Sequence, residues 1–328
     1  MKAVYYTKYG PPDVLQLREA EKPAVRDGEI LIKVHASTVT AVDCNFRQGK
    51  PFIAKLFTGL MRPKRPVLGT EFAGVVEATG QGVTRFTEGD CVFGTTIGFG
   101  AYAEYICFPE RKLTLEKVPS GITFDQAAAC DGFLTALPFL RDKGKITSGQ
   151  KVLIYGASGS VGTAAVQLAD HFGAEVTGMC STANLELVKS LKAANVIDYT
   201  KEDFADGGKT YDIIFDAVGK LSFSRCKRSL KSKGIFLTTD LVPTILPQML
   251  WTSIIGGKKA RIAFTGLRPV SERTKDLTII KELIEAGKIK PVIDRHYTLE
   301  QIAEAHRYVE QGHKRGNVII LVESESKS

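Results

Sequence analysis

Short apolar runs alternate with turn residues over the first third of the chain. The runs cover residues 29–36, 74–78, 91–93 and 101–107, and clusters of Gly, Pro and Asp separate them. Such runs between turn signals are typical of β-strands. We therefore expect residues 1–123 to form a mostly β, barrel-like domain. The basic, irregular stretch 45–66 is expected to be a helical insertion or lid.

The pattern changes near residue 124, where apolar runs become separated by stretches with helical spacing. These runs are residues 152–155, 175–179, 195–199, 212–215, 234–238 and 261–264. Alternating strands and helices predict a doubly wound parallel sheet, and we assign it to residues 124–268. Helices over 272–286 and 299–310 and a last strand over 317–322 follow, and we expect residues 269–328 to complete the first domain.

A glycine-rich turn joins the first of these strands to a helix. Residues 151–162 read KVLIYGASGSVG, with Gly156, Gly159 and Gly162 ahead of a helix that we expect to begin near Ser160. Free backbone N–H groups and the positive end of the helix dipole hold phosphates at such a turn. The turn therefore predicts dinucleotide binding; the alternative is an ordinary tight strand–helix connection.

The end of the second strand distinguishes the two nicotinamide dinucleotides. An acidic residue there bonds the ribose 2′-hydroxyl and repels a 2′-phosphate. Here the strand is followed by Cys180, Ser181 and Thr182, and the next acid is Glu186. This favours NADPH over NADH, with Lys189, Lys192 and Tyr199 expected nearby, although Ser181 is equally suited to cap a helix. The fourth strand ends at residues 215–219, so we expect Val218 to touch the cofactor, with Asp216 as a contact or a turn residue.

Composition narrows the class of protein. The chain has 328 residues, 44% hydrophobic and 24% charged, which is typical of a soluble globular protein. We see no apolar run of membrane-spanning length and no charged-then-apolar leader, so we expect a cytoplasmic protein without a membrane partner. The net charge of +8 is dispersed among acids, so a nucleic-acid partner is not expected. The six cysteines form no CxxC pair, and we interpret most of them as buried small hydrophobes.

Several motifs resemble one known family. They are the opening residues 1–17, LIKVHASTVTAVDCNFR at 31–47, LGTEFAG at 68–74, GDCVFG at 89–94, GAYAEY at 100–105 and VIDY at 196–199. The sequence resembles the medium-chain dehydrogenase/reductase superfamily, in its zinc-free, quinone-oxidoreductase-like branch. The resemblance implies an α/β protein in which a Rossmann NADPH-binding domain (124–268) accompanies a mostly β, GroES-like catalytic domain (1–123, completed by 269–328).

The resemblance also implies cofactor contacts. It places them at Ser158, Gly159, Ser160, Val161, Ser181, Tyr199 and Asn317, with Thr135 and Thr40 near the nicotinamide. Two departures from the family pattern stand out. Relatives often carry a lysine soon after the serine, where this chain has Ala183, Asn184 and Leu185. They often carry Lys or Arg after the last glycine, where Asn317 follows Gly316. We therefore expect a softer NADPH preference than is usual in the family.

The zinc-dependent relatives hold their metal with a Cys, a His and a third Cys or Asp. By motif alignment these positions fall on Thr40, Thr70 and Asp131, with Glu71 beside Thr70. Zinc prefers nitrogen and sulfur donors, so this set is a poor zinc site and we expect no metal.

A metal-free site favours reduction of an activated acceptor, because without a metal nothing lowers the pKa of an alcohol. We predict an NADPH-dependent, zinc-independent oxidoreductase that transfers hydride to a quinone or an α,β-unsaturated carbonyl. The sequence names no catalytic residue or physiological acceptor; the pocket candidates are Thr40, Asn45, Phe46 and Asp131. Tyrosines of related quinone reductases match Asn45 and Pro51 here.

Two other functions stay open. One is an alcohol or carbonyl dehydrogenase of the same superfamily. The other is a non-catalytic NADPH-binding module with affinity for RNA, which the basic composition suggests. The family resemblance implies a homodimer, and the apolar residues 244–255 are either its contact or a buried lid.

Overall fold

The protein is described by a computed structural model that covers residues 1–50, 55–206, 208–240, 245–254 and 257–322. The chain forms two compact units. The first comprises Met1–Asp131, Pro269–Glu285 and Pro291–Ser328, and the second comprises Gly132–Arg268 and Ala286–Lys290. The first unit thus extends past residue 123, because α3 (Phe124–Ala128) packs on strands β3 and β4 of its sheet.

A seven-stranded sheet organises the first unit, in the order β14-β15-β3-β4-β5-β7, with β6 paired to β3. Its strands are β3 (Glu29–Val39), β4 (Glu71–Thr79), β5 (Cys91–Thr96), β6 (Tyr105–Pro109), β7 (Leu113–Lys117), β14 (Ile293–Thr298) and β15 (Asn317–Leu321). The last strand, β15, pairs antiparallel with β3. A separate antiparallel pair consists of β1 (Lys2–Tyr5) and β2 (Gln16–Glu19).

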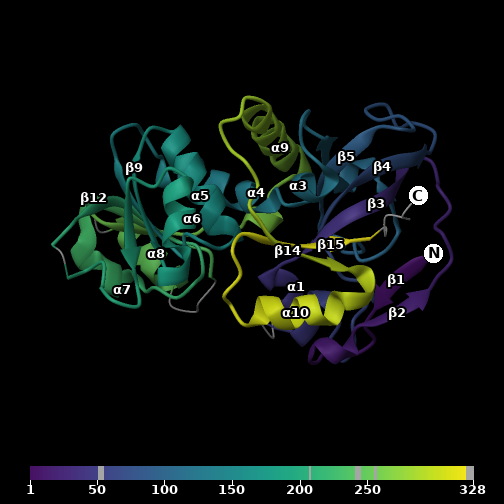
Figure 1. The fold of residues 1–328 in the computed structure, drawn as a ribbon, viewed down its shortest axis with the longest axis horizontal. Coiled ribbons are helices and arrows are strands. Elements are labelled where there is room, and N and C mark those ends of the chain that lie inside the picture. The colour runs from purple at the N-terminus through teal and green to yellow at the C-terminus, as the bar shows by residue number, and fades with distance from the viewer. Residues whose placement is uncertain (51–54, 207, 241–244, 255–256, 323–328) are drawn as a thin grey trace. The chain divides into compact units, whose positions relative to one another are not determined.

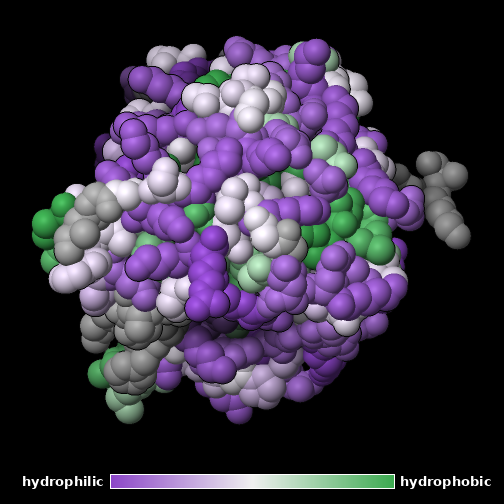
Figure 2. Space-filling view, turned by 90° about the vertical axis from the view of Figure 1, so that its left-hand side faces the viewer, coloured by the Kyte–Doolittle hydropathy of each residue, from purple (hydrophilic) through white to green (hydrophobic). Residues whose placement is uncertain are grey.

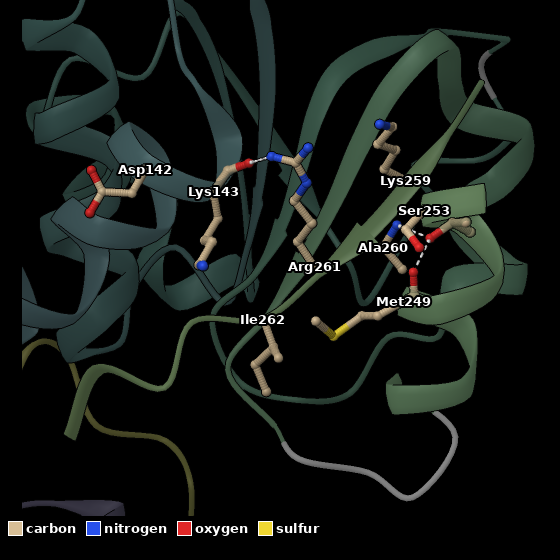
Figure 3. Close-up of a pocket in the computed structure, with 9 residues that line it drawn as sticks. Asp142, Lys143, Met249, Ser253, Lys259, Ala260, Arg261 and Ile262 are labelled. Atoms are coloured by element: carbon tan, nitrogen blue, oxygen red, sulfur yellow. Dashed lines mark hydrogen bonds between the residues drawn. The ribbon is translucent and has the colours of Figure 1, made fainter. Parts of the chain in front are cut away.

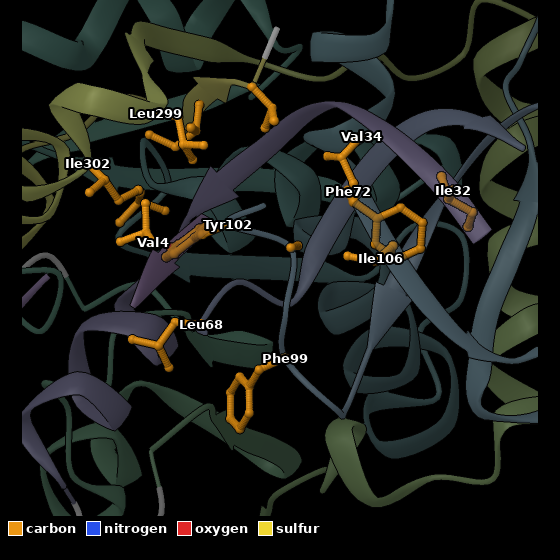
Figure 4. Close-up of a cluster of buried hydrophobic side chains, with 14 of the residues drawn as sticks. Val4, Ile32, Val34, Leu68, Phe72, Phe99, Tyr102, Ile106, Leu299 and Ile302 are labelled. Atoms are coloured by element: carbon orange, nitrogen blue, oxygen red, sulfur yellow. The ribbon is translucent and has the colours of Figure 1, made fainter. Parts of the chain in front are cut away.

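Short helices connect and cover these strands. They are α1 (Ala41–Gln48), α2 (Lys55–Thr58), α3, α9 (Val270–Glu285), α10 (Ile302–Glu310) and the 3-10 turns η1 (Pro12–Val14), η3 (Glu110–Lys112) and η8 (Leu299–Gln301). The core beneath them contains Ile32, Phe72 and Tyr102 from the N-terminal part, and Leu299 and Ile302 from the C-terminal part (Figure 4). The two ends of the sequence therefore share one hydrophobic core.

The second unit is a six-stranded parallel sheet in the order β10-β9-β8-β11-β12-β13. Its strands are β8 (Lys151–Tyr155), β9 (Glu175–Cys180), β10 (Asn195–Asp198), β11 (Tyr211–Asp216), β12 (Leu230–Thr238) and β13 (Lys259–Arg261). Every neighbouring pair runs parallel. The predicted doubly wound sheet is confirmed, with β13 beginning two residues earlier than the apolar run 261–264. The strand order reverses between β8 and β11, which is where such sheets bind ligands.

Helices cover both faces of this parallel sheet. They are α5 (Ser160–His171), α6 (Leu185–Ser190), α7 (Phe223–Cys226) and α8 (Ile245–Ile254), with the C-terminal part of α4 (Asp131–Pro138), the π-helical turn η4 (Phe139–Gly144), and the 3-10 turns η5 (Thr182–Asn184), η6 (Lys227–Ser229) and η7 (Thr265–Leu267). Figure 1 shows α5 and α6 together next to β9, and α7 and α8 together near β12. The helix α5 begins at Ser160, as the glycine-rich turn predicts.

Hydrophilic residues prevail on the face of the molecule in Figure 2, and hydrophobic residues form only small patches there. Across the described ranges, the helices are too short or too polar to span a bilayer.

Candidate functional site

The glycine-rich turn between β8 and α5 is shaped by two glycines. Gly156 has a φ of +78°, and a Cβ on it would lie 2.6 Å from Cγ1 of Val218. A Cβ on Gly162 would lie 2.0 Å from the carbonyl oxygen of Gly156. Gly159 has room for a side chain, since the nearest atom to its Cβ would be 3.6 Å away. Gly156 and Gly162 are therefore required by the turn itself, whereas Gly159 is not.

The beginning of α5 is open to a ligand. Gly159 is its N-cap residue and makes no side-chain cap bond. The first N–H groups of a helix have no partner within the helix and favour anions. Gly132 packs against this end, where a Cβ on it would lie 2.6 Å from the carbonyl oxygen of Ser160, and it is followed by the half-buried Thr135 on α4. The predicted phosphate-contacting residues 158–161 and Thr135 thus lie around one helix end.

Ser158 and Ser181 are joined by a residue to which the sequence assigned no function. The side-chain nitrogen Nδ2 of Asn184 donates hydrogen bonds to Oγ of Ser158 at 3.0 Å and Oγ of Ser181 at 3.2 Å. Ser181 occupies the N-cap position of η5, but its side chain makes no cap bond. The hydroxyl of Ser181 therefore does not cap the helical turn η5, although the residue occupies the N-cap position.

The remaining cofactor candidates of the second unit directly follow two strands of the sheet, Val218 near the end of β11 and Tyr199 after β10. Val218 is 45% exposed and lies against Gly156. Buried Asp216 accepts hydrogen bonds from the N–H groups of Val218 at 3.2 Å and Leu221 at 2.7 Å, so it is a turn residue that holds this loop. Tyr199 is 46% exposed, with its ring centroid 6.4 Å from that of Tyr155.

The charged residues near this strand edge are engaged with one another. Lys189 faces Glu186 at 3.0 Å. Lys192 faces Asp170 at 3.5 Å. Asp198 accepts hydrogen bonds from the hydroxyls of Thr182 and Thr200, and these bonds lower its pKa to about 2. The carboxylate was not singled out from the sequence, and the VIDY motif was its only signal.

Asn317 belongs to the first unit, apart from the other cofactor candidates. It is 4% exposed, and its Nδ2 donates to the carbonyl oxygens of Val292 at 3.0 Å and Ala129 at 3.3 Å. These bonds fasten the beginning of β15. Its contact with the cofactor stays a prediction.

The pocket candidates of the first unit gather around the beginning of α1. Thr40 is the N-cap residue, and its Oγ1 donates to Oδ2 of Asp43 at 2.6 Å in a capping box. Asn45 is exposed, and half-buried Phe46 packs edge-on against Phe99 with ring centroids 5.0 Å apart. Pro51 lies outside the described residues.

Three carboxyl groups share the interior of this unit. Burial, together with the charge of Asp131, raises the pKa of Glu71 well above its usual value, against a hydrogen bond from Thr38. Burial also raises the pKa of Asp131, although the nearby Arg273 opposes this. Burial raises the pKa of Asp43 to about 6. A buried carboxyl pair cannot easily hold two negative charges, so burial favours the protonated form of Glu71 and Asp131 more than it would for exposed carboxyl groups.

The side chains at the positions that match the zinc ligands of zinc-dependent relatives do not fit zinc. The Thr40 hydroxyl is engaged with Asp43, Thr70 offers only a second hydroxyl, and Asp131 supplies a single carboxylate. Zinc sites are built from thiolate and imidazole donors. Within the described part of the chain, no three His, Cys, Asp or Glu side chains are grouped to hold a metal ion.

A cavity of about 300 Å³ lies elsewhere in the second unit (Figure 3). It is lined by Asp142, Lys143, Met249, Thr252, Ser253, Lys259, Ala260, Arg261 and Ile262. Arg261 Nη1 donates to the carbonyl oxygen of Lys143 at 2.7 Å and closes one side. None of the predicted site residues lines this cavity.

Two family descriptions match the chain. "Alcohol dehydrogenase GroES-like domain" matches residues 26–120, and "Zinc-binding dehydrogenase" matches residues 191–320. The chain is 33% identical to an Arabidopsis thaliana NADPH-dependent alkenal/one oxidoreductase, covering 98% of this chain and 79% of the relative. It is 30% identical to the quinone oxidoreductase of Homo sapiens, covering 98% of each chain.

A solved structure shares the whole architecture. The Escherichia coli quinone oxidoreductase complexed with NADPH superposes with a TM-score of 0.84 at 26% identity, covering 98% of this chain and all of that one. The fold predicted from the sequence, a Rossmann unit with a GroES-like unit, is thereby confirmed. The chain belongs to the medium-chain dehydrogenase/reductase superfamily as a quinone-oxidoreductase-like protein, and it is an oxidoreductase.

Proposed function

We propose that this oxidoreductase uses NADPH to reduce quinones or α,β-unsaturated carbonyls without zinc. The observation that carries the proposal is the pair of hydroxyls on Ser158 and Ser181, joined through Asn184 beside the uncapped beginning of α5. Hydroxyl and backbone N–H donors suit phosphate oxygens, and no acid follows β9 until Glu186. The alkenal/one oxidoreductase and the NADPH-bound quinone oxidoreductase among the relatives support the same cofactor and acceptors.

The residues of the second unit bind and orient the cofactor. The N–H groups at the beginning of α5 would hold its pyrophosphate, and Ser158 and Ser181 its 2′-phosphate. Thr135 and Val218 are proposed to contact the nicotinamide half. When bound, NADPH supplies the hydride. Orientation of a bound donor contributes much of the acceleration in such a reaction.

The first unit supplies the groups for the acceptor. Reduction of a quinone or an enone also requires a proton, and burial raises the pKa of both Glu71 and Asp131, which favours their protonated forms. The interaction with Glu71 favours the charged form of Asp131, so we propose that Glu71 holds this proton and releases it through the less buried carboxyl group of Asp131. Thr40 and the exposed Asn45 are proposed to position the acceptor oxygen by hydrogen bonds, with Phe46 against its ring.

Anaerobic rapid mixing tests the proposal. Purified protein with bound NADPH is mixed with a simple quinone, with an enone, and with no acceptor, before and after exhaustive dialysis against a zinc chelator. We expect oxidation of NADPH with at least one acceptor class, unchanged by the chelator. The proposal is wrong if neither class oxidises NADPH, or if activity is lost to the chelator and restored by zinc.

Two controls distinguish the other functions. Oxidation of simple alcohols with NADP⁺, without reduction of quinones or enones, would instead identify an alcohol dehydrogenase. Retention of RNA in a salt-dependent manner, without any turnover, would identify the non-catalytic module.

We also propose that the protein forms a homodimer through α8. Four apolar side chains of this ten-residue helix are at least half exposed: Leu246, Leu250, Trp251 and Ile254. Grouped exposure of large apolar side chains marks interaction surfaces. Residues 244 and 255, the ends of the predicted contact stretch, lie outside the described residues.

A further inference from the structure

We propose that Asn184 determines the preference for NADPH over NADH, by turning the hydroxyl hydrogens of Ser158 and Ser181 toward the 2′-phosphate. The inference rests on the proposed function and goes further, because it assigns cofactor selectivity to a residue that would not itself need to touch the cofactor. Asn184 is thus a positioning residue.

The first argument is proximity. Ser158 comes from the turn after β8, and Ser181 follows β9, so the two lie on different connections. One nitrogen atom, Nδ2 of Asn184, is within hydrogen-bond distance of both Oγ atoms. The two hydroxyls therefore share one small site, of the size that a single phosphate group occupies.

The second argument is the direction of the hydrogen bonds. An amide nitrogen can only donate, so both Oγ atoms accept from Asn184 and keep their own hydrogens for another acceptor. Among the hydrogen bonds of the described residues, neither Ser158 nor Ser181 donates to a protein atom. A dianionic phosphate supplies the missing acceptors, and a ribose hydroxyl supplies a weaker one.

The third argument is that, among the described residues, the side-chain oxygen of Asn184 lacks a hydrogen-bond partner. Its side chain is buried, at 7% exposure, and its Oδ1 has no hydrogen-bond partner. Leaving a buried carbonyl oxygen unpaired is costly, and an apolar residue would avoid the cost. The benefit must therefore come from Nδ2, whose only partners in the described structure are the two serines.

The fourth argument is the charge around this site. Lys189 and Lys192 are paired with Glu186 and Asp170. The carboxylate of Asp198, on the strand beside β9, is held by the hydroxyls of Thr182 and Thr200. The charged side chains named here thus have partners of their own, whereas the hydroxyl hydrogens of Ser158 and Ser181 are left for the phosphate.

The test measures binding of cofactor fragments by isothermal titration calorimetry, without turnover. The fragments are 2′,5′-ADP, which carries the 2′-phosphate, and 5′-AMP, which lacks it. We expect the unaltered protein to bind 2′,5′-ADP about tenfold tighter than 5′-AMP, since charge-assisted hydrogen bonds contribute about that much. Asn184→Ala should reduce this ratio to about twofold, with little change for 5′-AMP.

Asn184→Asp is the sharper variant, because it keeps the shape and reverses the bonds. An aspartate accepts from both serine hydroxyls and adds a negative charge, so 2′,5′-ADP should bind more weakly than 5′-AMP. The matched control is Asn195→Ala, at an exposed position of β10, which should leave both affinities unchanged. In a Ser158→Ala/Ser181→Ala background, Asn184→Ala should have no further effect on the ratio.

The outcomes separate the two claims. A ratio that Asn184→Asp leaves unchanged overturns the inference while the proposed function stands. Equal weakening of both fragments, with an equal fall in thermal stability, shows a purely structural role and also overturns it. If neither fragment binds the unaltered protein, the inference and the proposed function fail together.

Discussion

The side chain of Gln167 forms hydrogen bonds with both backbone groups of Lys290, which lies 123 residues further along the chain. The amide nitrogen Nε2 donates to the Lys290 carbonyl oxygen at 3.0 Å, and Oε1 accepts from the Lys290 N–H at 2.8 Å. Nε2 also donates to the carbonyl oxygen of Thr163 at 3.1 Å. One glutamine of α5 thus fastens the returning segment Ala286–Lys290 to the second unit.

Gln167→Ala should therefore lower the free energy of unfolding. It leaves a partly buried N–H and a carbonyl group unpaired, which costs about 1–3 kcal/mol. Urea denaturation followed by circular dichroism measures the change. The exposed Gln311→Ala is the control and should change the midpoint little. Equal midpoints for both variants would show that the contact does not contribute.

The glycine-rich turn predicts effects of very different size for two similar substitutions. Gly162→Ala places a Cβ 2.0 Å from a backbone carbonyl oxygen, which cannot move without distorting the turn. We expect a loss of about 2 kcal/mol or more in unfolding free energy. Gly159→Ala has open space and a φ of −80°, and should change stability by less than about 0.5 kcal/mol. Thermal unfolding of the two variants measures the difference. Similar losses of stability in both variants would contradict the geometry of the turn.

Glu71→Gln should flatten the dependence of stability on pH. In the unfolded chain Glu71 ionises near its ordinary pKa of 4.5, whereas in the folded protein its pKa is well above that value, so the folded state holds the proton longer. The contribution of Glu71 to the free energy of unfolding is therefore fully present below pH 4.5, and it is lost as the pH rises from there through the pKa of the folded protein.

The variant, which cannot ionise at this position, should gain stability relative to the unaltered protein as the pH rises from 5 to 8. Urea denaturation at the two pH values measures this. The variant retains a smaller slope from Asp43, whose raised pKa of about 6 acts in the same direction. A parallel pair of pH profiles would show that Glu71 is ionised in the folded state.

The cysteines should differ sharply in reactivity. Cys91 is exposed and Cys107 half-buried, whereas Cys44, Cys130, Cys180 and Cys226 are buried. Burial raises the pKa of Cys44 to about 12 and that of Cys180 to about 11, and a thiol that stays protonated is a poor nucleophile. Brief labelling with an alkylating reagent, followed by mass spectrometry, should modify Cys91 first and the four buried thiols only after denaturation. Rapid labelling of Cys44 in the native protein would contradict this.

The proposed dimer has a direct test. Leu250→Glu and Trp251→Glu place a charge on side chains of α8 that are 67% and 66% exposed, so neither should disturb the core. We expect light scattering to show a dimer for the unaltered protein and a monomer for both variants. Leu267→Glu, at an 82% exposed position outside α8, should stay dimeric. A monomeric unaltered protein would refute the dimer.

Elements with a strong local pattern were predictable from the sequence. The strands of the second unit overlap the predicted apolar runs, although β12 begins four residues and β13 two residues before its run, and α5 begins at Ser160 as predicted. The hydrophobic patterning and the turn chemistry agree there, so local information suffices. The return of residues 286–290 to the second unit was not predictable, because it depends on Gln167, and nothing local marks this partner.

The site shows the same division. Ser158 and Ser181 follow from their positions after strands of a parallel sheet. Asn184 stood out in the sequence only as a replacement for a lysine, because its role depends on bringing two serines from separate connections to one nitrogen atom. The raised pKa values of Glu71 and Asp131 were likewise not predictable from the sequence, since the burial and mutual repulsion that cause them exist only in the folded chain.

The antiparallel pairing of β15 with β3 also has a consequence for folding during synthesis. On the ribosome, β3 emerges before the whole parallel sheet, and its neighbour β15 emerges after that sheet. The nascent Rossmann unit can therefore fold before residues 36–39 of β3 have paired with β15. Until β15 has been synthesised, this part of β3 is an unpaired strand edge, and such edges make nascent chains prone to aggregation.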